Sequence, residues 1–425
     1  MSDNKHYDLI GIGIGLFNLS LAALLSKTPD VKFRFFDRKH RFDWHSEIMF
    51  ADSEMQTSYM KDLVTAADPT NPFSFMNFLV QKGLFYAFLN TGRQTITRRE
   101  FEMYCQWVSQ NLPEYLSFDS DIESVTYDGS KFILTINGEI FTAQNICIGT
   151  GLVPHLPEFA QALEGPEVFH AKSSYLKLLD ATNKDVVVVG GGQTGLEIFR
   201  NCLQGKWGHP KSLKLIASRQ NLEPLDNSPF VNEYFTPSYV KEFLQLDQDQ
   251  KDPIVKYQKL ASDGNTPEYL ETLYRDLYQL KHVWGDKRQI EILPYRRVTE
   301  MVKIGDRYKM HIHNGFSNQS ETTTADTVVL STGFRMNIPS LIEPLRPMIN
   351  FDENGRFQMN QDFQVSWNGS ENNKIFALNF SRHGHGISEP QTSLMAWRSA
   401  RIINNLTKKS IFPIDKAVPN FITYI

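Results

Sequence analysis

The pattern of apolar and polar positions contains two similar arrangements, each a short apolar run that ends in glycines and precedes a helical segment. The first run covers residues 7–10, and helical spacing follows over 18–26. The second run, 185–189, is rich in valine, and helical spacing follows over 196–203. Short apolar runs bounded by glycine are typical of parallel strands that are covered on both faces. We therefore expect two separate units that each begin with a strand, a glycine turn and a helix.

The first glycine turn has the composition of a dinucleotide site. It contains Gly11, Gly13 and Gly15, and the next apolar run ends at Asp37. Glycines allow the backbone to approach a pyrophosphate, the following helix N-terminus offers free N–H groups, and the acid accepts hydrogen bonds from ribose. Leu16 stands where the third glycine of G-x-G-x-x-G would be, so the motif is incomplete.

The second glycine turn matches the full motif, because Gly190, Gly192 and Gly195 follow the valine-rich run at the required spacing. The next apolar run, 212–217, ends near Arg219. A basic residue at this place favours the 2′-phosphate of NADP, although a solvated surface arginine is the alternative. Two such turns predict two dinucleotides, most simply a tightly held FAD and an exchangeable NADPH.

Composition and charge narrow the functional class. The 425 residues suffice for two or more domains, and 41% hydrophobic with 22% charged residues is ordinary for a globular protein. The formal net charge of −4 does not indicate a nucleic-acid partner. Three distant cysteines form neither a disulfide framework nor a metal-ligand spacing, so we expect no metal and a cytoplasmic location.

One apolar stretch, 9–25, resembles a membrane or signal segment in its hydropathy. Its first half is punctuated by glycines, and no small-residue cleavage site follows cleanly. A strand, a glycine turn and a helix explain the stretch better, so we expect no membrane span.

The cysteine content also restricts what a flavin can do in this chain. A disulfide reductase needs two closely spaced cysteines near the flavin, and none occurs before Cys105. No cluster of histidine and cysteine indicates iron–sulfur or haem ligation. Oxygen activation by a reduced flavin requires a dry pocket and no protein metal. These observations favour a monooxygenase, and the open alternative is an NADPH-dependent flavoprotein reductase or oxidase without oxygen insertion.

Several ordered segments carry a resemblance to a known family. They are residues 55–64, 68–75, 226–237, 385–387 and 393–401. With these segments the chain resembles the siderophore-pathway N-hydroxylating flavin monooxygenases, and most of all their lysine N-monooxygenase branch. The resemblance spans the chain from about Tyr7 to about Asn405. It implies that FAD, NADPH and molecular oxygen are used to hydroxylate a primary amine on a small molecule.

The resemblance implies an α/β fold with two Rossmann-like dinucleotide-binding domains and a small helical substrate-binding region. We expect the FAD domain over residues 1–165, with a C-terminal return and a tail over 345–425. The NADPH domain is then expected over 166–344. Within it, 223–290 is rich in helix formers and charge, which predicts a helical cap over the substrate pocket. The tail after Ile411 is expected to be loosely attached.

Three groups of site residues follow from the resemblance. The residues implied to contact FAD are Gly11, Gly13, Gly15, Asp37, Trp44, His45, Gln56, His385 and Gly386. The residues implied to contact NADPH are Gly190, Gly192, Gln193, Thr194, Gly195 and Arg219. The residues implied to contact the substrate are Lys61, Asn232 and Ser393, with Asp263 as a further acid. No residue is assigned as an acid or base, because the flavin carries the chemistry.

Some of these residues also have simpler structural interpretations. Trp44 and His45 could be a core residue and a helix cap, and Lys61 stands at a position typical of a solvated lysine. Asp263 can cap the helix that follows it. His385 lies on a glycine-rich loop, which suits close approach of the backbone to a cofactor at least as well as proton transfer.

The identity of the amine stays open at this point. The resemblance favours lysine, with Lys61 on its carboxylate, whereas ornithine, cadaverine, putrescine or histamine would need a similar pocket. A decarboxylated amine would leave Lys61 without a carboxylate partner. Because members of the family are often oligomeric, a homo-oligomer is a further expectation.

Overall fold

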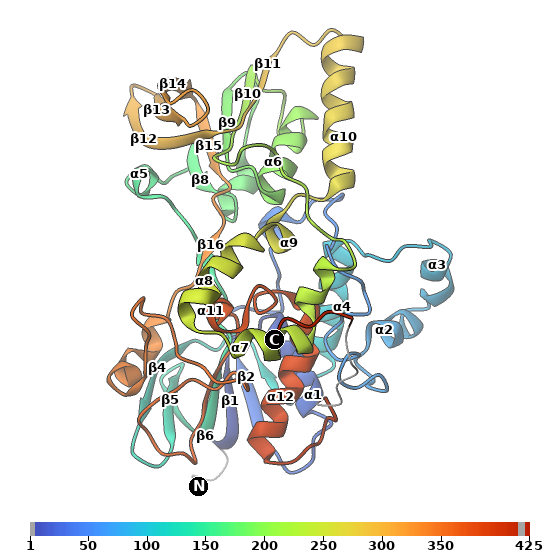
Figure 1. Cartoon of the computed structure of the whole chain (residues 1–425), viewed down its shortest axis with the longest axis vertical. Coiled ribbons are helices and arrows are strands. Elements are labelled where there is room, and N and C mark those ends of the chain that lie inside the picture. Colours follow the sequence, from blue (N-terminus) through green and yellow to red (C-terminus); the bar gives the residue numbers. More distant parts are fainter. Residues whose placement is uncertain (1–4, 415–420) are drawn as a thin grey trace.

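The computed structural model describes residues 5–414 and 421–425, and it contains two main β-sheets arranged along its long axis (Figure 1). The chain starts in the first sheet, passes to the second, and returns to the first with its C-terminal segment. The two units predicted from the apolar pattern are therefore both present.

The first sheet has the strand order β3-β2-β1-β6-β5-β4, and β17 also pairs with β6. Its strands are β1 His6–Ile12, β2 Phe33–Phe36, β3 Leu116–Ser117, β4 Ile122–Tyr127, β5 Phe132–Ile136, β6 Glu139–Ile148 and β17 Ile375–Ala377. Pairing is parallel between β3, β2, β1, β6 and β17, and antiparallel along β6, β5 and β4. The C-terminal segment thus completes the sheet that the N-terminal segment begins.

The second sheet is parallel throughout, with the strand order β11-β10-β9-β15-β8. Its strands are β8 Val168–His170, β9 Asp185–Val189, β10 Ser212–Ile216, β11 Gln289–Leu293 and β15 Thr327–Leu330. An antiparallel sheet is formed by β12 Arg296–Ile304, β13 Arg307–Asn314 and β14 Gln319–Ala325. The short strands β7 Val153–Pro154 and β16 Phe334–Arg335 pair with each other where the chain passes between the two main sheets.

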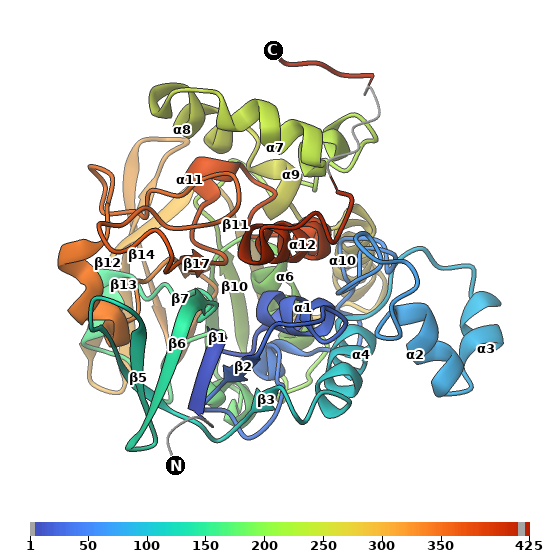
Figure 2. The same ribbon diagram turned by 90° about the horizontal axis from the view of Figure 1, so that it is seen from below.

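Helices cover both sheets. The α-helices are α1 Leu16–Leu25, α2 Phe75–Gln81, α3 Phe85–Leu89, α4 Arg98–Gln110, α5 Glu158–Gln161, α6 Gln193–Leu203, α7 Pro237–Leu244, α8 Gln248–Tyr257, α9 Leu260–Asp263, α10 Pro267–Tyr278, α11 Arg382–His385 and α12 Met395–Thr407. The short 3₁₀ and π segments are η2 Ser46–Ile48, η3 Ser174–Leu178, η4 Val231–Phe235, η5 Gln279–Val283, η6 Ser340–Met348 and η7 Thr392–Leu394. Helices α1 and α12 lie side by side, with the hydroxyl oxygens of Ser20 and Ser399 3.0 Å apart (Figure 2).

The apolar stretch 9–25 forms the end of β1, the first glycine turn and most of α1. Leu19, Leu21 and Leu24 are fully buried, because α1 is packed between the first sheet and the helices around it. Among the described residues, no helix is long and apolar enough to cross a membrane. The hydropathy of this stretch is therefore explained by burial within the fold.

The chain changes sheets somewhat earlier than predicted at both crossings. Ala160 already packs in a core that includes residues of β9 and β15, whereas the predicted boundary was at 165. Ile342 already packs against the first sheet, whereas the predicted return began at 345. The paired strands at the crossings have only two residues each, which is too short for a pattern of apolar positions to mark them.

The predicted cap over 223–290 contains four α-helices, but they do not form one layer. Helices α7 and α8 contact α11 of the C-terminal return, whereas α10 packs on the second sheet through Tyr269 and Leu273. The tail after Ile411 falls partly on residues 415–420, which lie outside the described residues. Phe412 is buried and Tyr424 contacts the ring of Tyr239, whereas Phe421 and Ile425 are exposed.

Candidate active site

A cavity of about 1460 Å³ lies where the two units and the helical segment meet. Its lining comes from the first glycine turn, from the segment 36–61, from residues between 225 and 262, and from the loops 378–379 and 390–393. Small-ligand pockets are typically about 300–1,000 Å³. This cavity therefore has room for an extended cofactor together with a second molecule.

The first glycine turn forms one wall of this cavity through Gly13 and Gly15. Gly13 has a φ of +87°, and a Cβ there would lie 2.8 Å from the carbonyl oxygen of Gly149. Gly15 is the N-cap of α1, and no side chain caps the helix. Its first-turn N–H groups are thus available to an anion. Gly11 does not line the cavity. A glycine is needed there because a Cβ would collide with the ring of Phe35.

Asp37 lies at the end of β2 and lines the same wall. Its carboxylate accepts hydrogen bonds from the backbone N–H groups of Ile14, at 2.7 Å, and Lys39, at 2.9 Å. These bonds fix the carboxylate beside the glycine turn and leave lone pairs for ribose hydroxyls. The predicted acid and the predicted turn are therefore brought together by the structure.

Trp44 and His45 also line the cavity. The Nδ1 atom of His45 is buried and has no hydrogen-bond partner among the described residues. Burial, with Lys172, Arg98 and Lys39 nearby, lowers the pKa of His45 to about 3. A neutral imidazole with an unsatisfied buried nitrogen is costly by itself, so its environment fits a bound polar cofactor.

Four residues predicted at the flavin and substrate end, Gln56, Lys61, Asn232 and Ser393, all line the cavity. Gln56 Nε2 donates to the carbonyl oxygen of Gly264 at 3.3 Å and so joins this wall to the helical segment. Lys61 is half-buried, and burial lowers the pKa of its ammonium. Within the described part of the chain, no carboxylate forms an ion pair with it.

The second glycine turn, between β9 and α6, has the close approaches of a dinucleotide turn. Gly190 has a φ of +125°, and a Cβ there would lie 2.1 Å from the carbonyl oxygen of Ser331. A Cβ at Gly195 would lie 1.9 Å from the carbonyl oxygen of Gly190. Gly192 is the N-cap of α6 and has open space around it. Of the residues predicted to contact NADPH, Gln193 lines the large cavity. The others, Thr194 among them, do not.

Asp263, predicted to contact the substrate, is not among the residues that line the cavity. Its carboxylate lies 3.6 Å from the guanidinium of Arg382, and its carbonyl oxygen accepts from Nη2 of Arg219 at 2.8 Å. It does not cap the following helix either, because the N–H of Thr266 bonds instead to Oε1 of Gln193 at 2.9 Å. Asp263 therefore joins two arginines behind the cavity wall.

His385 and Gly386, predicted to contact FAD, are also not among the residues that line the cavity. The His385 imidazole is 1% exposed and stacks on Phe363 with ring centroids 4.3 Å apart. Its Nδ1 atom lies 2.6 Å from the hydroxyl oxygen of Ser381. Burial and the nearby Arg398 lower the pKa of His385 to about 3, so the ring is a neutral core group.

Arg98 lines the cavity but was not among the predicted site residues. Thr97 and Glu100 form a capping box that starts α4, and this motif places Arg98 at a helix N-terminus. The sequence gives no further signal, because the partner of Arg98 is Glu197, 99 residues along the chain and 2.9 Å away in space.

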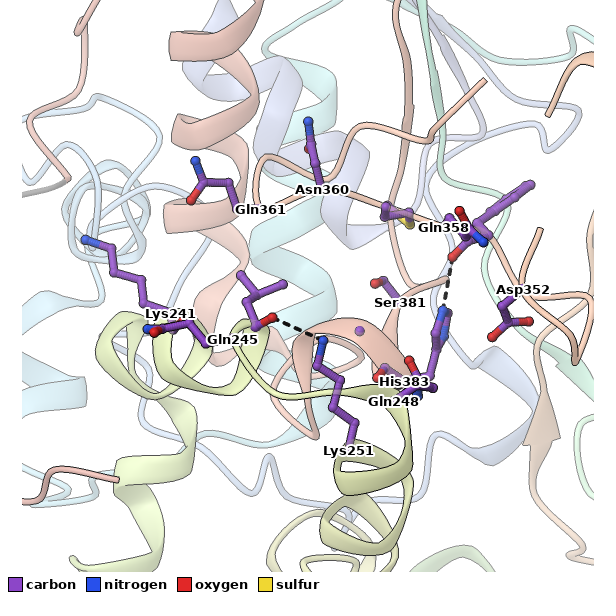
Figure 3. Close-up of a pocket in the computed structure, with 14 residues that line it drawn as sticks. Lys241, Gln245, Gln248, Lys251, Asp352, Gln358, Asn360, Gln361, Ser381 and His383 are labelled. Carbon is purple, nitrogen blue, oxygen red and sulfur yellow. Dashed lines mark hydrogen bonds between the residues drawn. The ribbon is translucent and has the colours of Figure 1, made fainter. Parts of the chain in front are cut away.

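A second cavity, of about 620 Å³, lies between α7, α8, the start of α11 and the segment 357–361 (Figure 3). Lys251 Nζ donates to the carbonyl oxygen of Leu244 at 3.2 Å, and His383 Nε2 donates to that of Phe357 at 3.0 Å. These polar groups are satisfied within the protein, and no glycine turn opens into this cavity. Among the described residues, no cluster of histidine, cysteine or acidic side chains could hold a metal ion.

Two dinucleotide turns, one at the end of a parallel strand in each main sheet, share a cavity that no cysteine lines, and they define a two-dinucleotide flavoprotein. The chain belongs to the family described as L-lysine 6-monooxygenase/L-ornithine 5-monooxygenase, whose model matches residues 5–336. The resemblance predicted from the sequence motifs is thus confirmed.

Full-length relatives agree with this assignment. The chain is 38% identical to the L-lysine N6-monooxygenase of Escherichia coli, over 97% of each chain. It is 30% identical to a putrescine N-hydroxylase of Acinetobacter baumannii, over 98% of this chain and 94% of the relative.

Solved structures agree as well. The FAD-bound cadaverine monooxygenase DfoA of Erwinia amylovora has a TM-score of 0.93 at 26% identity, over 99% of both chains. The Kutzneria ornithine N-hydroxylase KtzI, solved with reduced FAD, NADP⁺ and L-ornithine, has a TM-score of 0.87 at 27% identity, over 95% of this chain and 99% of that one.

The predicted α/β fold with two Rossmann-like domains and the predicted dependence on FAD and NADPH are confirmed by these matches. The protein is a flavin-dependent N-hydroxylating monooxygenase that acts on the terminal amine of a small molecule in siderophore biosynthesis. The reductase or oxidase without oxygen insertion is correspondingly not favoured.

Proposed function

We propose that the amine substrate is L-lysine and that Lys61 binds its carboxylate. The observation that carries this proposal is the half-buried ammonium of Lys61, which lines the cavity and has no carboxylate partner among the described residues. A charged group taken out of water is costly unless it is paired, and a substrate carboxylate would supply the pairing. The 38% identity to the lysine enzyme of E. coli supports the same substrate.

A diamine is the second candidate, because relatives named for putrescine and cadaverine also match the chain over almost its whole length. The far end of a diamine is an ammonium, which would face the ammonium of Lys61. Two like charges in a partly dry cavity repel each other. This repulsion favours the amino acid over the diamine.

FAD is assigned to the wall formed by Gly13, Gly15 and Asp37, and bound there it supplies the oxygen chemistry. The first-turn N–H groups of α1 would hold the pyrophosphate, and Asp37 the ribose. His45, with its unsatisfied Nδ1 atom, and Gln56 would face the flavin end of the cofactor.

NADPH is assigned to the turn of Gly190, Gly192 and Gly195, with Gln193 where this turn meets the cavity. Arg219 would hold the 2′-phosphate, because its Nη1 atom is buried and has no partner among the described residues. With these assignments the FAD domain consists of the chain before about residue 155 and after about residue 340, and the NADPH domain lies between them.

The amine must be neutral to be hydroxylated, and the unperturbed pKa of a lysine side chain is about 10.4. Leu225, Phe235 and Leu378 line the cavity and exclude water from part of it. Low-polarity surroundings disfavour an ammonium, as the lowered pKa of Lys61 illustrates. The cavity would therefore promote loss of the proton from the reacting amine, while Asn232 and Ser393 orient the substrate.

A cytoplasmic location and a homo-oligomer are two further proposals. Cys105, Cys147 and Cys202 are free and buried, as expected in a reducing compartment. The helices α2 and α3 project from the body and carry exposed apolar side chains, among them Tyr86 and Leu89. Light scattering coupled to gel filtration measures the oligomeric state directly.

Replacing Lys61 by methionine tests the substrate assignment. Loss of a charge-assisted pairing of roughly 1.5–3 kcal/mol should raise KM for lysine by about 10- to 150-fold. KM for cadaverine should stay the same or fall, because an opposing charge is removed. The measurement is NADPH oxidation with hydroxylamine assayed alongside, for each amine separately.

The matched control is Lys82→Met, since Lys82 is exposed at the C-cap of α2 and does not line the cavity. It should leave both KM values unchanged. Equal changes for lysine and cadaverine in Lys61→Met would remove the carboxylate role. A wild-type enzyme that forms hydroxylamine from cadaverine but not from lysine would overturn the substrate itself.

A further inference from the structure

Helix α6, which begins at the second glycine turn, carries two opposite charges one turn apart that both bind residues of the FAD domain. Glu197 receives two hydrogen bonds from the guanidinium of Arg98, at 2.9 and 3.0 Å. Arg200 donates to the carboxylate of Asp52 at 2.6 Å. We call these two ion pairs, Arg98–Glu197 and Asp52–Arg200, the α6 clip.

The two FAD-domain residues of the clip lie on two segments that a backbone hydrogen bond joins. The N–H of Arg98 donates to the carbonyl oxygen of Ser53 at 2.8 Å, so Arg98 and Asp52 are held beside each other. The cation Arg98 therefore faces the anion Glu197, and the anion Asp52 faces the cation Arg200. The two ion pairs therefore specify both the position and the direction of the helix, because sliding or reversing α6 would bring like charges together.

Burial makes the Arg98–Glu197 ion pair costly to break. The Glu197 side chain is fully buried, and that of Arg98 is 14% exposed. Burial raises the pKa of Glu197, whereas the charge of Arg98 lowers it. Removing one partner of such a pair leaves an uncompensated charge in the interior, which is strongly unfavourable. Displacement of α6 from this position would have the same consequence.

The clip also reaches the residue that joins the NADPH turn to the cavity. Glu197 Oε1 accepts a second hydrogen bond from Nε2 of Gln193 at 3.0 Å. The Oε1 atom of Gln193 accepts from the N–H of Thr266 at 2.9 Å, which fixes the amide in one orientation. Arg98 and Gln193 both line the cavity, so Arg98, Glu197 and Gln193 form a continuous bonded path between its two cofactor walls.

We propose that Arg98 and Glu197 are positioning residues for hydride transfer: through the α6 clip they hold the NADPH turn at the distance and angle from the flavin wall that the transfer requires. The proposal rests on the assignment of NADPH to this turn. Transfer between two bound groups depends steeply on alignment, and a misplacement of about 1 Å can reduce the rate by about 100-fold. Affinity for the nucleotide depends on the contacts that the glycine turn makes with it, and the ion pair of Arg98 and Glu197 lies outside that turn.

The variants Arg98→Met, Glu197→Gln and the double variant test this role. We expect each single variant to slow anaerobic reduction of the bound flavin at saturating NADPH by about 10-fold or more. NADP⁺ affinity, measured by titration calorimetry, should change by less than about 3-fold in Arg98→Met, and FAD content should not change. Because both residues act through one ion pair, the double variant should be no slower than the slower single variant.

Two further variants separate positioning from general stability. Asp362→Asn removes another well-buried ion pair, with Arg401 at 2.5 Å, that does not line the cavity. It should lower the melting temperature without slowing flavin reduction. Arg98→Lys keeps the charge but loses the bidentate hydrogen bonding to Glu197. It should therefore fold, and its rate of flavin reduction should fall less than that of Arg98→Met.

Three results would overturn the proposal. Slow reduction in Arg98→Met with a wild-type rate in Glu197→Gln would mean that Arg98 acts on a cofactor directly. Additive losses in the double variant would mean that the two residues act separately. If every variant that folds reduces its flavin at the wild-type rate, the clip contributes only to stability.

Discussion

The two dinucleotide turns are built alike but are held in place differently. In each, a glycine with positive φ lies against the backbone at the end of a neighbouring parallel strand: Gly13 against Gly149, and Gly190 against Ser331. The first turn is then closed from within its own sheet by Asp37 on the N–H of Ile14. The second has no such internal closure.

The second turn is braced by residues from outside its own strand–turn–helix unit. Asn265 Nδ2 donates to the carbonyl oxygen of Gly191 at 3.1 Å, and the N–H of Thr266 donates to Gln193, which is also bound by Glu197 of α6. Glu197 is in turn held by Arg98 of the FAD domain. A turn closed within its own sheet suits a cofactor that stays bound. A turn braced by neighbours suits a nucleotide that must exchange and yet be aligned at each turnover.

Gly13→Ala should have the largest effect, because it breaks the turn that is closed within its own sheet. The substitution combines a φ of +87° with a Cβ only 2.8 Å from the carbonyl oxygen of Gly149. Left-handed backbone at a non-glycine residue costs of order 1–3 kcal/mol, and the backbone clash adds to it. We expect purified protein to contain little FAD, as measured by flavin absorbance per polypeptide. Gly138→Ala, also at positive φ but with no atom within 4 Å and outside the cavity, should keep its flavin.

Gly190→Ala should separate the two turns, with a smaller effect on the whole enzyme. Its Cβ would meet the carbonyl oxygen of Ser331 at 2.1 Å, so the second turn must shift. We expect FAD content to be retained and KM for NADPH to rise by about 10-fold or more, since a displaced turn loses backbone contacts of about 1.4 kcal/mol or more. Gly165→Ala is the matched control, because no atom lies nearer than 4.0 Å to its Cβ and it lines neither the turn nor the cavity. Equal loss of FAD and NADPH use in Gly190→Ala would contradict the independence of the two turns.

The difference between a turn closed within its own sheet and a turn braced by distant segments also explains which features could be predicted from the sequence. The strand 185–189 agrees with the structure residue for residue, because a valine-rich run before glycine leaves few alternatives. Asp37 was found from its distance along the chain to the first turn, since both belong to one local unit. Local motifs therefore specify the first turn almost completely.

The braces of the second turn could not be predicted in this way. Asp263 was expected at the substrate, but its partner Arg382 is brought to it only by the return of the chain to the first sheet. His385 was expected at the flavin, but the ring of Phe363 provides a core position for it. Glu197 reads as an ordinary helix residue until Arg98 is placed beside it. Each of these outcomes depends on pairing between distant segments, which periodicity and spacing do not encode.

The smallest effect should be an acid sensitivity that belongs to the FAD domain. His385 has its pKa lowered to about 3, so it is neutral in the folded protein and protonates on unfolding at mildly acid pH. Because the unfolded state then binds more protons, this histidine's contribution to stability is complete above its unfolded pKa of about 6.5 and is lost progressively as the pH falls from there toward 3. The loss is about 1.4 kcal/mol per pH unit in that window.

In His385→Gln, which retains a side chain able to bond to Ser381, the free energy of unfolding should fall less steeply between pH 6.5 and 5 than in the wild type. The variant itself will be less stable at neutral pH, because it loses the stacking on Phe363. The slope, and not the absolute stability, is therefore the measurement, and urea unfolding at a series of pH values gives it. An unchanged slope would mean that His385 is already protonated in the fold, in contradiction to a neutral core imidazole.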